Sequence, residues 1–191
     1  MSNQSTMGMT LIMNSDFDEI LKFFARAYTL EHTHRYSMTP TIKKESVASH
    51  CFFVALGVRL MHTVFNFNLE KALCMAISHD MTEIEISDVN HAVKKRYPVL
   101  AKAIRQVEQQ ASESFPQVIS EDLVNYSSHS VEAMVVHLAD ALQVWQYTQS
   151  EIDLGNMGQV NTIHANSVIR VDEMLEKLKS HKRALEDDTK H

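Results

Sequence analysis

Glycine and proline are scarce in this chain of 191 residues, which contains four glycines and three prolines. No stretch shows the regular alternation of valine, isoleucine and threonine that is typical of strands, so a fold built on sheets is not expected. Methionine, a good helix former, occurs 11 times. The composition therefore predicts an all-α protein, and the length is that of one ordinary domain.

Cysteine and long apolar runs are also in short supply. Cys51 and Cys74 stand alone in apolar helical patterns, which excludes a disulfide framework and predicts two reduced residues of the core. No apolar run approaches the roughly 20 residues that a membrane span needs, and the first residues lack the basic flank and cleavage site of a signal peptide. These absences predict a cytoplasmic protein that does not enter a membrane.

Basic residues are outnumbered by acidic ones, 18 against 24, which gives a formal net charge of −6. A nucleic acid polymer is not an expected partner, because its phosphate backbone requires a basic face. A small anionic ligand is compatible with this charge if local cations or a metal ion meet it.

The hydrophobic periodicity predicts a series of amphipathic helices. They are expected at about 15–30, 46–65, from Asn68 to beyond residue 80, 98–114, 130–151 and 161–179. Residues 88–97 are expected to form a loop or a short helical turn. Residues 1–14 are predicted to be a flexible N-terminal segment, 15–180 the single domain and 181–191 a solvated C-terminal tail.

Three of these helices turn polar side chains towards the interior. His50 lies on the apolar stripe of the second helix, the pair His79–Asp80 continues the apolar face of the third, and Asp140 interrupts the stripe of 130–151. Buried carboxylates without partners are costly, and a divalent cation would satisfy all four side chains at once. Two imidazoles and two carboxylates are a common ligand set for Zn, Mn, Fe or Co, with room left for water.

The order His50, then His79–Asp80, then Asp140 in "HLADAL" resembles the HD-domain metal-dependent phosphohydrolases over about residues 16–180. Within that superfamily, "RYSMTPTIKKESVASH" and "HDMTEIEISD" are most similar to YfbR-like 5′-deoxynucleotidases and small phage dATP triphosphohydrolases. The resemblance implies a single-domain HD-type helical bundle with His50, His79, Asp80 and Asp140 as metal ligands.

The same resemblance implies Glu83 and Asp88 as catalytic acids, and Arg35, Tyr36 and Lys94 as substrate contacts. The implied reaction is hydrolysis of a deoxynucleotide of the dATP or dAMP type, in which metal-activated water attacks the α-phosphate. The metal would be Co, Mn, Zn or Fe, with Mg as a further option for a triphosphate. The resemblance also implies a homo-oligomer, a dimer or a hexamer, in the cytoplasm, which is the host's if the chain is phage-encoded.

Two other functions remain open at this point. A di-iron oxygenase on the same fold needs two further histidines, for which His91, His129 and His137 are candidates. Related di-metal enzymes commonly carry lysine at the position of Glu83, which favours the hydrolase. The third hypothesis, a non-catalytic nucleotide-binding protein that has kept the fold, is disfavoured because the metal ligands and both acids are all present.

Overall fold

The computed structural model describes residues 15–188, so the expected flexible segment 1–14 lies outside the described residues. Within the described part the chain is helical and forms no strand, which confirms the all-α prediction. The elements are α1 (Ser15–Ala27), the 3-10 helix η1 (Tyr28–Glu31), α2 (Val47–Met61), α3 (Leu69–Ser78), α4 (Glu83–Ile86), α5 (His91–Arg96), α6 (Pro98–Glu113), α7 (Gln117–Tyr126), α8 (Val131–Asp153) and α9 (Gln159–Asp188).

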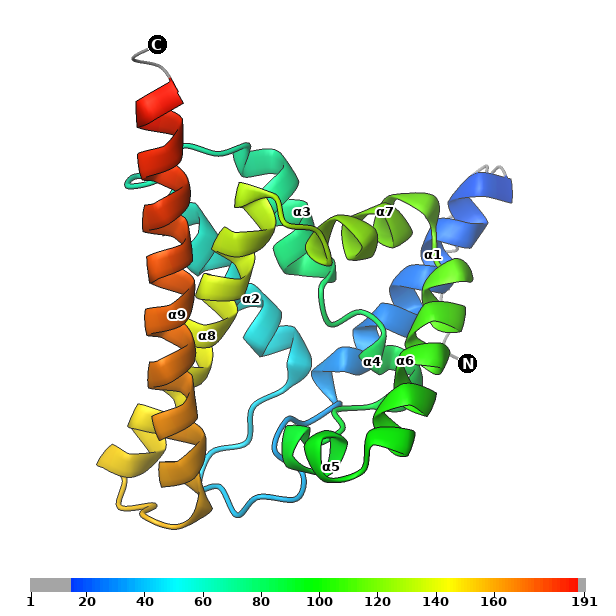
Figure 1. Ribbon diagram of the computed structural model, residues 1–191. Helices are drawn as coiled ribbons and strands as arrows, with labels where there is room; N and C mark the ends of the chain where they lie inside the picture. Colours follow the sequence, from blue (N-terminus) through cyan, green and yellow to red (C-terminus); the bar gives the residue numbers. More distant parts are fainter. Residues whose placement is uncertain (1–14, 189–191) are drawn as a thin grey trace, which may run out of the picture.

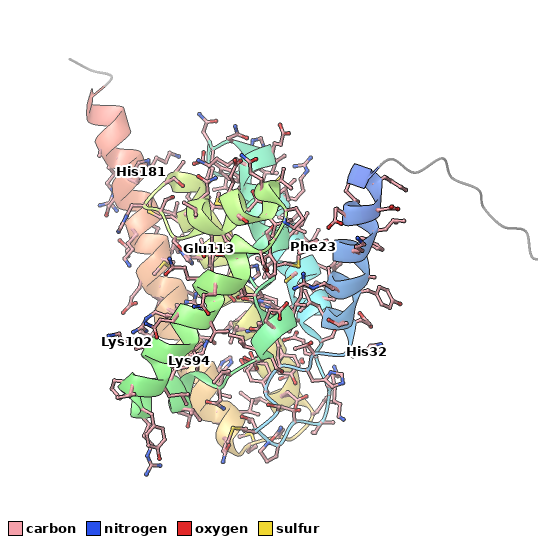
Figure 2. The ribbon with its side chains drawn as sticks, turned by 90° about the vertical axis from the view of Figure 1, so that its right-hand side faces the viewer. Phe23, His32, Lys94, Lys102, Glu113 and His181 are labelled. Atoms are coloured by element: carbon pink, nitrogen blue, oxygen red, sulfur yellow. The ribbon has the colours of Figure 1, made fainter. Side chains whose placement is uncertain are left out.

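Two long helices, α8 and α9, run side by side along one flank of the bundle, and α2 and α3 pack against the inner face of α8 (Figure 1). α1 and α6 stand on the opposite flank, and Figure 2 likewise separates α1 from α9. The main apolar core lies between α2, α3, α8 and α9 and includes Val54, Met75, Val136 and Leu178. The polar groups singled out in the sequence lie on α2, just after the end of α3 and on α8. The packing of these helices brings the polar groups together where the apolar core ends.

α2 begins where the sequence predicts. The side chain of Ser46 accepts a hydrogen bond from the backbone N–H of Ser49 at 3.1 Å, a cap worth about 1 kcal/mol. The expected apolar stripe, which runs from Val47 to Met61, is buried. Because His50 lies in the first turn after the cap and on this stripe, its side chain is directed into the interior.

α3 also has the predicted cap, since Asn68 accepts a hydrogen bond from the N–H of Lys71 at 3.0 Å. The helix ends at Ser78, however, and does not carry Asp80 and Glu83 on its own face as predicted. The backbone continues in short turns, with Met81 N–H donating to the carbonyl of Ser78 and Glu83 N–H to that of Asp80. Residues 79–82 thus lie in turns and not in a continuous helix, although adjacent residues on a regular helix would diverge by about 100°.

Several boundaries differ from the prediction. α7 was not predicted; it is anchored to α3 by the hydroxyl of Ser78, which donates to Asp122 at 2.8 Å. Part of the segment 88–97 is the helix α5. α9 continues to Asp188, through most of the residues expected to form a tail after 180, because no proline or glycine interrupts it.

One prediction about burial was wrong. Cys74 lies on the exposed side of α3, whereas Cys51 is buried as expected. On α1, the described part of the chain leaves Ile20, Leu21 and Phe24 between 42% and 68% exposed. None of the helices among residues 15–188 is both long enough and apolar enough to cross a membrane.

Candidate metal centre

Four side chains predicted as metal ligands meet at one point between α2, the end of α3 and α8. The Nε2 atom of His50 lies 3.1 Å from Nε2 of His79, 3.5 Å from Oδ2 of Asp80 and 3.4 Å from Oδ1 of Asp140. Nε2 of His79 lies 3.4 Å from Oδ2 of Asp80. The turn after Ser78 therefore lets two neighbouring residues present their ligand atoms to the same point.

Hydrogen bonds fix how both imidazoles face this point. Nδ1 of His79 donates to the carbonyl of Ala76 at 2.9 Å, and Nδ1 of His50 lies 2.6 Å from Oε1 of Gln143. With its hydrogen on Nδ1, each ring directs its Nε2 atom at the other ring. Burial and the nearby guanidinium of Arg35 lower the pKa of His50 to about 3, so this ring is in the neutral form that binds metals.

The carboxylates remain charged despite their burial. Burial alone would raise the pKa of Asp140, but the guanidinium of Arg170 and the two histidines hold that pKa well below its usual range. Oδ2 of Asp140 accepts a hydrogen bond from Arg170 on α9 at 2.7 Å, which leaves Oδ1 directed at His50. The pKa of Asp80 is likewise lowered, because His79, His50 and Arg35 outweigh the effect of burial.

The arrangement fits a divalent cation. Ligand atoms about 2.1 Å from one ion are about 3.0–3.4 Å apart at tetrahedral or octahedral angles, close to the distances observed here. Two facing imidazole lone pairs only 3.1 Å apart repel each other, and a cation between them would turn this repulsion into two bonds. Two histidines and two carboxylates suit Zn, Mn, Fe or Co and leave coordination positions for water.

Four buried polar side-chain atoms of the described residues have no hydrogen-bond partner, and their residues adjoin this ligand group. They are Nη1 of Arg35, the hydroxyl of Tyr36, Oε2 of Glu45 and Oε2 of Glu83. Leaving such an atom without a partner costs about 1–3 kcal/mol, and more for a charged group. A cluster of them next to one ligand group is the arrangement expected of a site that binds a polar, charged molecule.

Arg35 and Tyr36, which the sequence predicts as substrate contacts, lie beside the candidate metal centre. The Arg35 guanidinium is close enough to Asp80 and Asp140 that these acids raise its pKa against the opposing effect of burial, and it lies 4.0 Å from Oε2 of Glu45. The Tyr36 ring stacks on Tyr147 at 5.0 Å with an interplanar angle of 2°, and Arg35 lies over the ring at 5.5 Å. Both side chains are therefore held rigidly.

Asp88 is tied to the loop that carries Arg35 and Tyr36. Its Oδ2 atom accepts a hydrogen bond from the backbone N–H of Tyr36 at 2.9 Å. Tyr36 has a φ of 59° and Ser87, next to Asp88, has a φ of 61°, a left-handed conformation that costs a side-chain-bearing residue about 1 kcal/mol or more. These two residues lie on either side of the hydrogen bond between Asp88 and Tyr36. Their unfavourable backbone conformations indicate that the position of these side chains is maintained at a cost in folding stability.

A cavity of about 500 Å³ opens beside the metal centre, which is a volume suited to a small molecule. Glu83 and Lys94 both line it, together with His79 and Asp80. Burial and the negative charges of Asp80 and Asp88 raise the pKa of Glu83 to about 8.

Lys94 lies 3.5 Å from Glu108 in the cavity wall, and Figure 2 shows Lys94 on the flank formed by α5 and α6. The remaining lining residues come mainly from α4, α6 and α7, and include Ile86, Gln109, Leu123 and Tyr126.

The sequence interpretation missed a row of polar residues along α8. After Asp140, Gln143 contacts His50 and Glu45, Tyr147 stacks on Tyr36, and the buried Glu151 accepts hydrogen bonds from the N–H groups of Ile42 and Lys43, both at 2.7 Å. Spacings of three and four residues place this row on one helix face. The spacing of three residues from Asp140 is a signal that could have identified Gln143. No such signal points to its partner Glu45, because Glu45 lies 98 residues away in sequence.

Of the candidate histidines for a di-iron centre, the two whose side chains are described, His129 and His137, do not join the ligand group. Among the residues whose side chains are described, the groups able to hold a metal ion are His50–His79–Asp140 and Cys51–His79–Asp80. The His137 ring packs against Tyr126, with the ring centroids 4.3 Å apart and the planes tilted by 44°, and His129 is exposed. The side chain of His91 lies outside the described residues. Cys51 is buried in an apolar cluster with Val47 and Met81, which raises the pKa of its thiol.

Comparison with known proteins agrees with this geometry. Residues 22–186 match the model of a protein family described as 5′-deoxynucleotidase YfbR-like. A 5′-deoxynucleotidase of Vibrio parahaemolyticus is 25% identical over 148 residues, which cover 70% of this chain and 76% of the relative.

Solved structures share the fold. An HD-domain phosphohydrolase of Listeria innocua superposes with a TM-score of 0.70 at 18% identity, over 88% of this chain and 87% of its own. The HD phosphohydrolase DatZ of cyanophage S-2L, bound to dA and one catalytic Zn²⁺ ion, superposes with a TM-score of 0.57 at 14% identity, over 84% of this chain and 96% of its own. The helical bundle is thus the HD-domain fold.

Proposed function

Because the chain belongs to the family of YfbR-like 5′-deoxynucleotidases, which are metal-dependent HD phosphohydrolases, we propose that it hydrolyses 2′-deoxynucleoside 5′-monophosphates to deoxynucleosides and phosphate. The observation that carries the proposal is the close approach of His50 to His79, Asp80 and Asp140. Beside this group lie the unpartnered buried atoms of Arg35, Tyr36 and Glu83. A phosphate ester supplies the anionic and polar atoms that these groups lack.

His50, His79, Asp80 and Asp140 would hold the metal ion. A divalent cation bound there would activate water and offset the charge of the phosphoryl oxygens. Arg35 contributes a permanent positive charge, and its unpartnered Nη1 atom is available to donate to a phosphate oxygen. Because Arg35 is buried against Tyr36 and the acids, little side-chain freedom is lost when the phosphate binds.

Glu83 and Asp88 are the acids that exchange protons in this proposal. Oε2 of Glu83 lies in the cavity wall without a partner, so it is free to bind the attacking water or the leaving 5′ oxygen. Asp88 uses Oδ2 to hold the Tyr36 backbone, and its second oxygen is the one available to the substrate. The reaction consumes one water, breaks the bond between phosphorus and the 5′ oxygen, and places a proton on that oxygen.

The substrate we propose is a monophosphate, because the site offers few cations to a longer phosphate chain. Among the described residues that line the cavity, Lys94 is the one basic side chain, and Glu108 already lies 3.5 Å from it. Deoxyadenylate is the base to test first, since the neighbour DatZ is bound to dA. The rigid ring of Tyr36 would lie against the deoxyribose and leave no room for a 2′-hydroxyl.

A screen of deoxynucleotides with Mn, Co, Zn and Mg, in which the products are identified, tests this proposal. The expected products from dAMP are deoxyadenosine and inorganic phosphate. Release of tripolyphosphate from dATP, with no turnover of dAMP, would instead make the protein a triphosphohydrolase. Release of neither product with any of these metals would refute a phosphohydrolase of deoxynucleotides.

We further propose that the protein is a homodimer, because the described residues leave apolar side chains of α1 and α2 exposed. Four side chains on α1 and η1 and four on α2 are between 42% and 68% exposed; they are Ile20, Leu21, Phe24, Tyr28, Phe52, Phe53, Leu56 and Leu60. At about 100 Å² each, they present on the order of 800 Å², which exceeds the usual apolar patch of a monomer and equals one side of a standard interface. A second copy of the chain would cover both faces by twofold symmetry.

A further inference from the structure

A chain of buried contacts connects the metal centre with the proposed phosphate contact. It starts at Nδ1 of His50, which is 2.6 Å from Oε1 of Gln143. Nε2 of Gln143 donates to Oε1 of Glu45 at 2.5 Å, and the other oxygen of Glu45 lies 4.0 Å from Nη1 of Arg35. His50, Gln143 and Glu45 are each less than one-tenth exposed, so water does not compete for these contacts.

The donor and acceptor roles along this series of contacts are fixed by the chemistry of its side chains. The carboxylate of Glu45, facing the Arg35 guanidinium, can only accept hydrogen bonds, so the amide nitrogen of Gln143 must point towards it. The amide oxygen of Gln143 then points at His50, and this places the hydrogen of the ring on Nδ1. The lone pair of His50 Nε2 is thereby left free in the ligand group.

We propose that Glu45 and Gln143 are positioning residues that set the orientation and tautomer of His50 and so determine the affinity of the metal site. The inference rests on the metal centre of the proposed function. Glu45 serves both halves of the site, because the carboxylate that orients Gln143 also faces Arg35. The loop that carries Glu45 and Arg35 is itself held, with the N–H of Arg35 donating to the carbonyl of Glu45 at 2.9 Å.

The test measures binding of Co²⁺ to the metal-free full-length chain, by competition with a chromogenic chelator. Gln143→Leu removes both hydrogen bonds at nearly constant volume, and we expect its affinity for Co²⁺ to fall about 10- to 100-fold, as is typical for partners of metal-bound histidines. Gln146→Leu is the matched control, because it makes the same change on the exposed side of α8 and should bind as the wild type does.

An exchange of the two side chains separates orientation from packing. Glu45→Gln alone keeps the shape but no longer fixes the direction of the Gln143 amide, so its affinity should also fall. In the double variant E45Q/Q143E the carboxylate at position 143 accepts from His50, and the amide at position 45 donates to it. We expect this exchange to restore the affinity to within about twofold of the wild type.

The inference is overturned if Gln143→Leu binds Co²⁺ as tightly as the wild type, or if the double variant binds no better than Glu45→Gln. Glu45→Gln and the double variant keep the test decisive even if Gln143→Leu fails to fold. The measurement involves no substrate, so its outcome is separate from that of the proposed function. A wild type that binds Co²⁺ without hydrolysing nucleotides would refute only the function.

Discussion

The carboxylate of Asp88 holds the backbone N–H of Tyr36 at 2.9 Å, across 52 residues of sequence. This contact joins the segment after α4, which lines part of the cavity, to the loop before α2, which carries Arg35 beside the metal centre. Asp88 therefore has two roles in this account: it holds the loop through this contact, and it exchanges a proton in the proposed reaction.

Substitution of Asp88 should separate these roles. Asp88→Asn keeps an oxygen for the Tyr36 N–H but cannot take up a proton, so we expect kcat for dAMP to fall about 100-fold with little change in KM. Asp88→Ala should lower kcat similarly and also raise KM, because the loop loses its contact. Steady-state kinetics of both variants give the answer, and an Asp88→Asn variant with the turnover of the wild type would exclude a catalytic role for this acid.

Glu83 should be required for turnover but not for the metal. Glu83→Gln preserves the size of the side chain and removes its ability to exchange a proton, for which the expected loss in kcat is about 10²- to 10⁴-fold. Metal content measured by elemental analysis should stay at the level of the wild type. Glu85→Gln, two residues further on and exposed at the surface, is the control and should keep full activity. Full activity in Glu83→Gln would contradict its proposed role.

Tyr36 should govern the choice between deoxyribose and ribose. The ring is fixed between Tyr147 and Arg35, so a 2′-hydroxyl pressed against it would lose its water without gaining a partner. That cost is about 1–3 kcal/mol, and it predicts that kcat/KM for dAMP exceeds that for AMP by about 10- to 100-fold. Tyr36→Ala should narrow this ratio, whereas Tyr97→Ala, at an exposed tyrosine, should leave it unchanged. Equal kcat/KM values for the two substrates in the wild type would refute the sugar preference.

The uncovered faces of α1 and α2 should mediate dimerisation. Light scattering at micromolar concentration should give the mass of two chains for the wild type and that of one chain for Phe24→Asp or Leu60→Asp, because burial of a carboxylate in an apolar interface is costly. Val118→Asp places the same charge on an exposed position of α7 and should leave the dimer intact. A wild type with the mass of a single chain would contradict the proposal.

Much of this architecture could be predicted because it depends on local rules. The Ser46 and Asn68 caps and the buried stripe of α2 follow from residues within one or two turns of each other. The four candidate ligands were singled out in the sequence because buried polar residues on apolar stripes need a partner. The HD-domain fold and the family followed from the order of these ligands in the chain.

Other features depend on contacts that a single sequence does not display. The contact between Gln143 and Glu45 spans 98 residues of sequence. The end of α3 at Ser78 coincides with no proline or glycine that the sequence could have signalled. The sequence shows that α1 has an apolar side, but hydrophobic periodicity does not tell which part of the protein, or of a second copy, covers that side. Cys74 was misplaced for a related reason, since a small side chain in an apolar segment fits either face of a helix.

Phosphate release from dAMP by the metal-depleted protein, as Co²⁺ or Mn²⁺ is added back, tests the central claim most directly. The account predicts that turnover is absent after chelation, rises with added metal and reaches a plateau at one ion per chain, because His50, His79, Asp80 and Asp140 form one site. Turnover of dAMP that persists unchanged after complete removal of metal would contradict it.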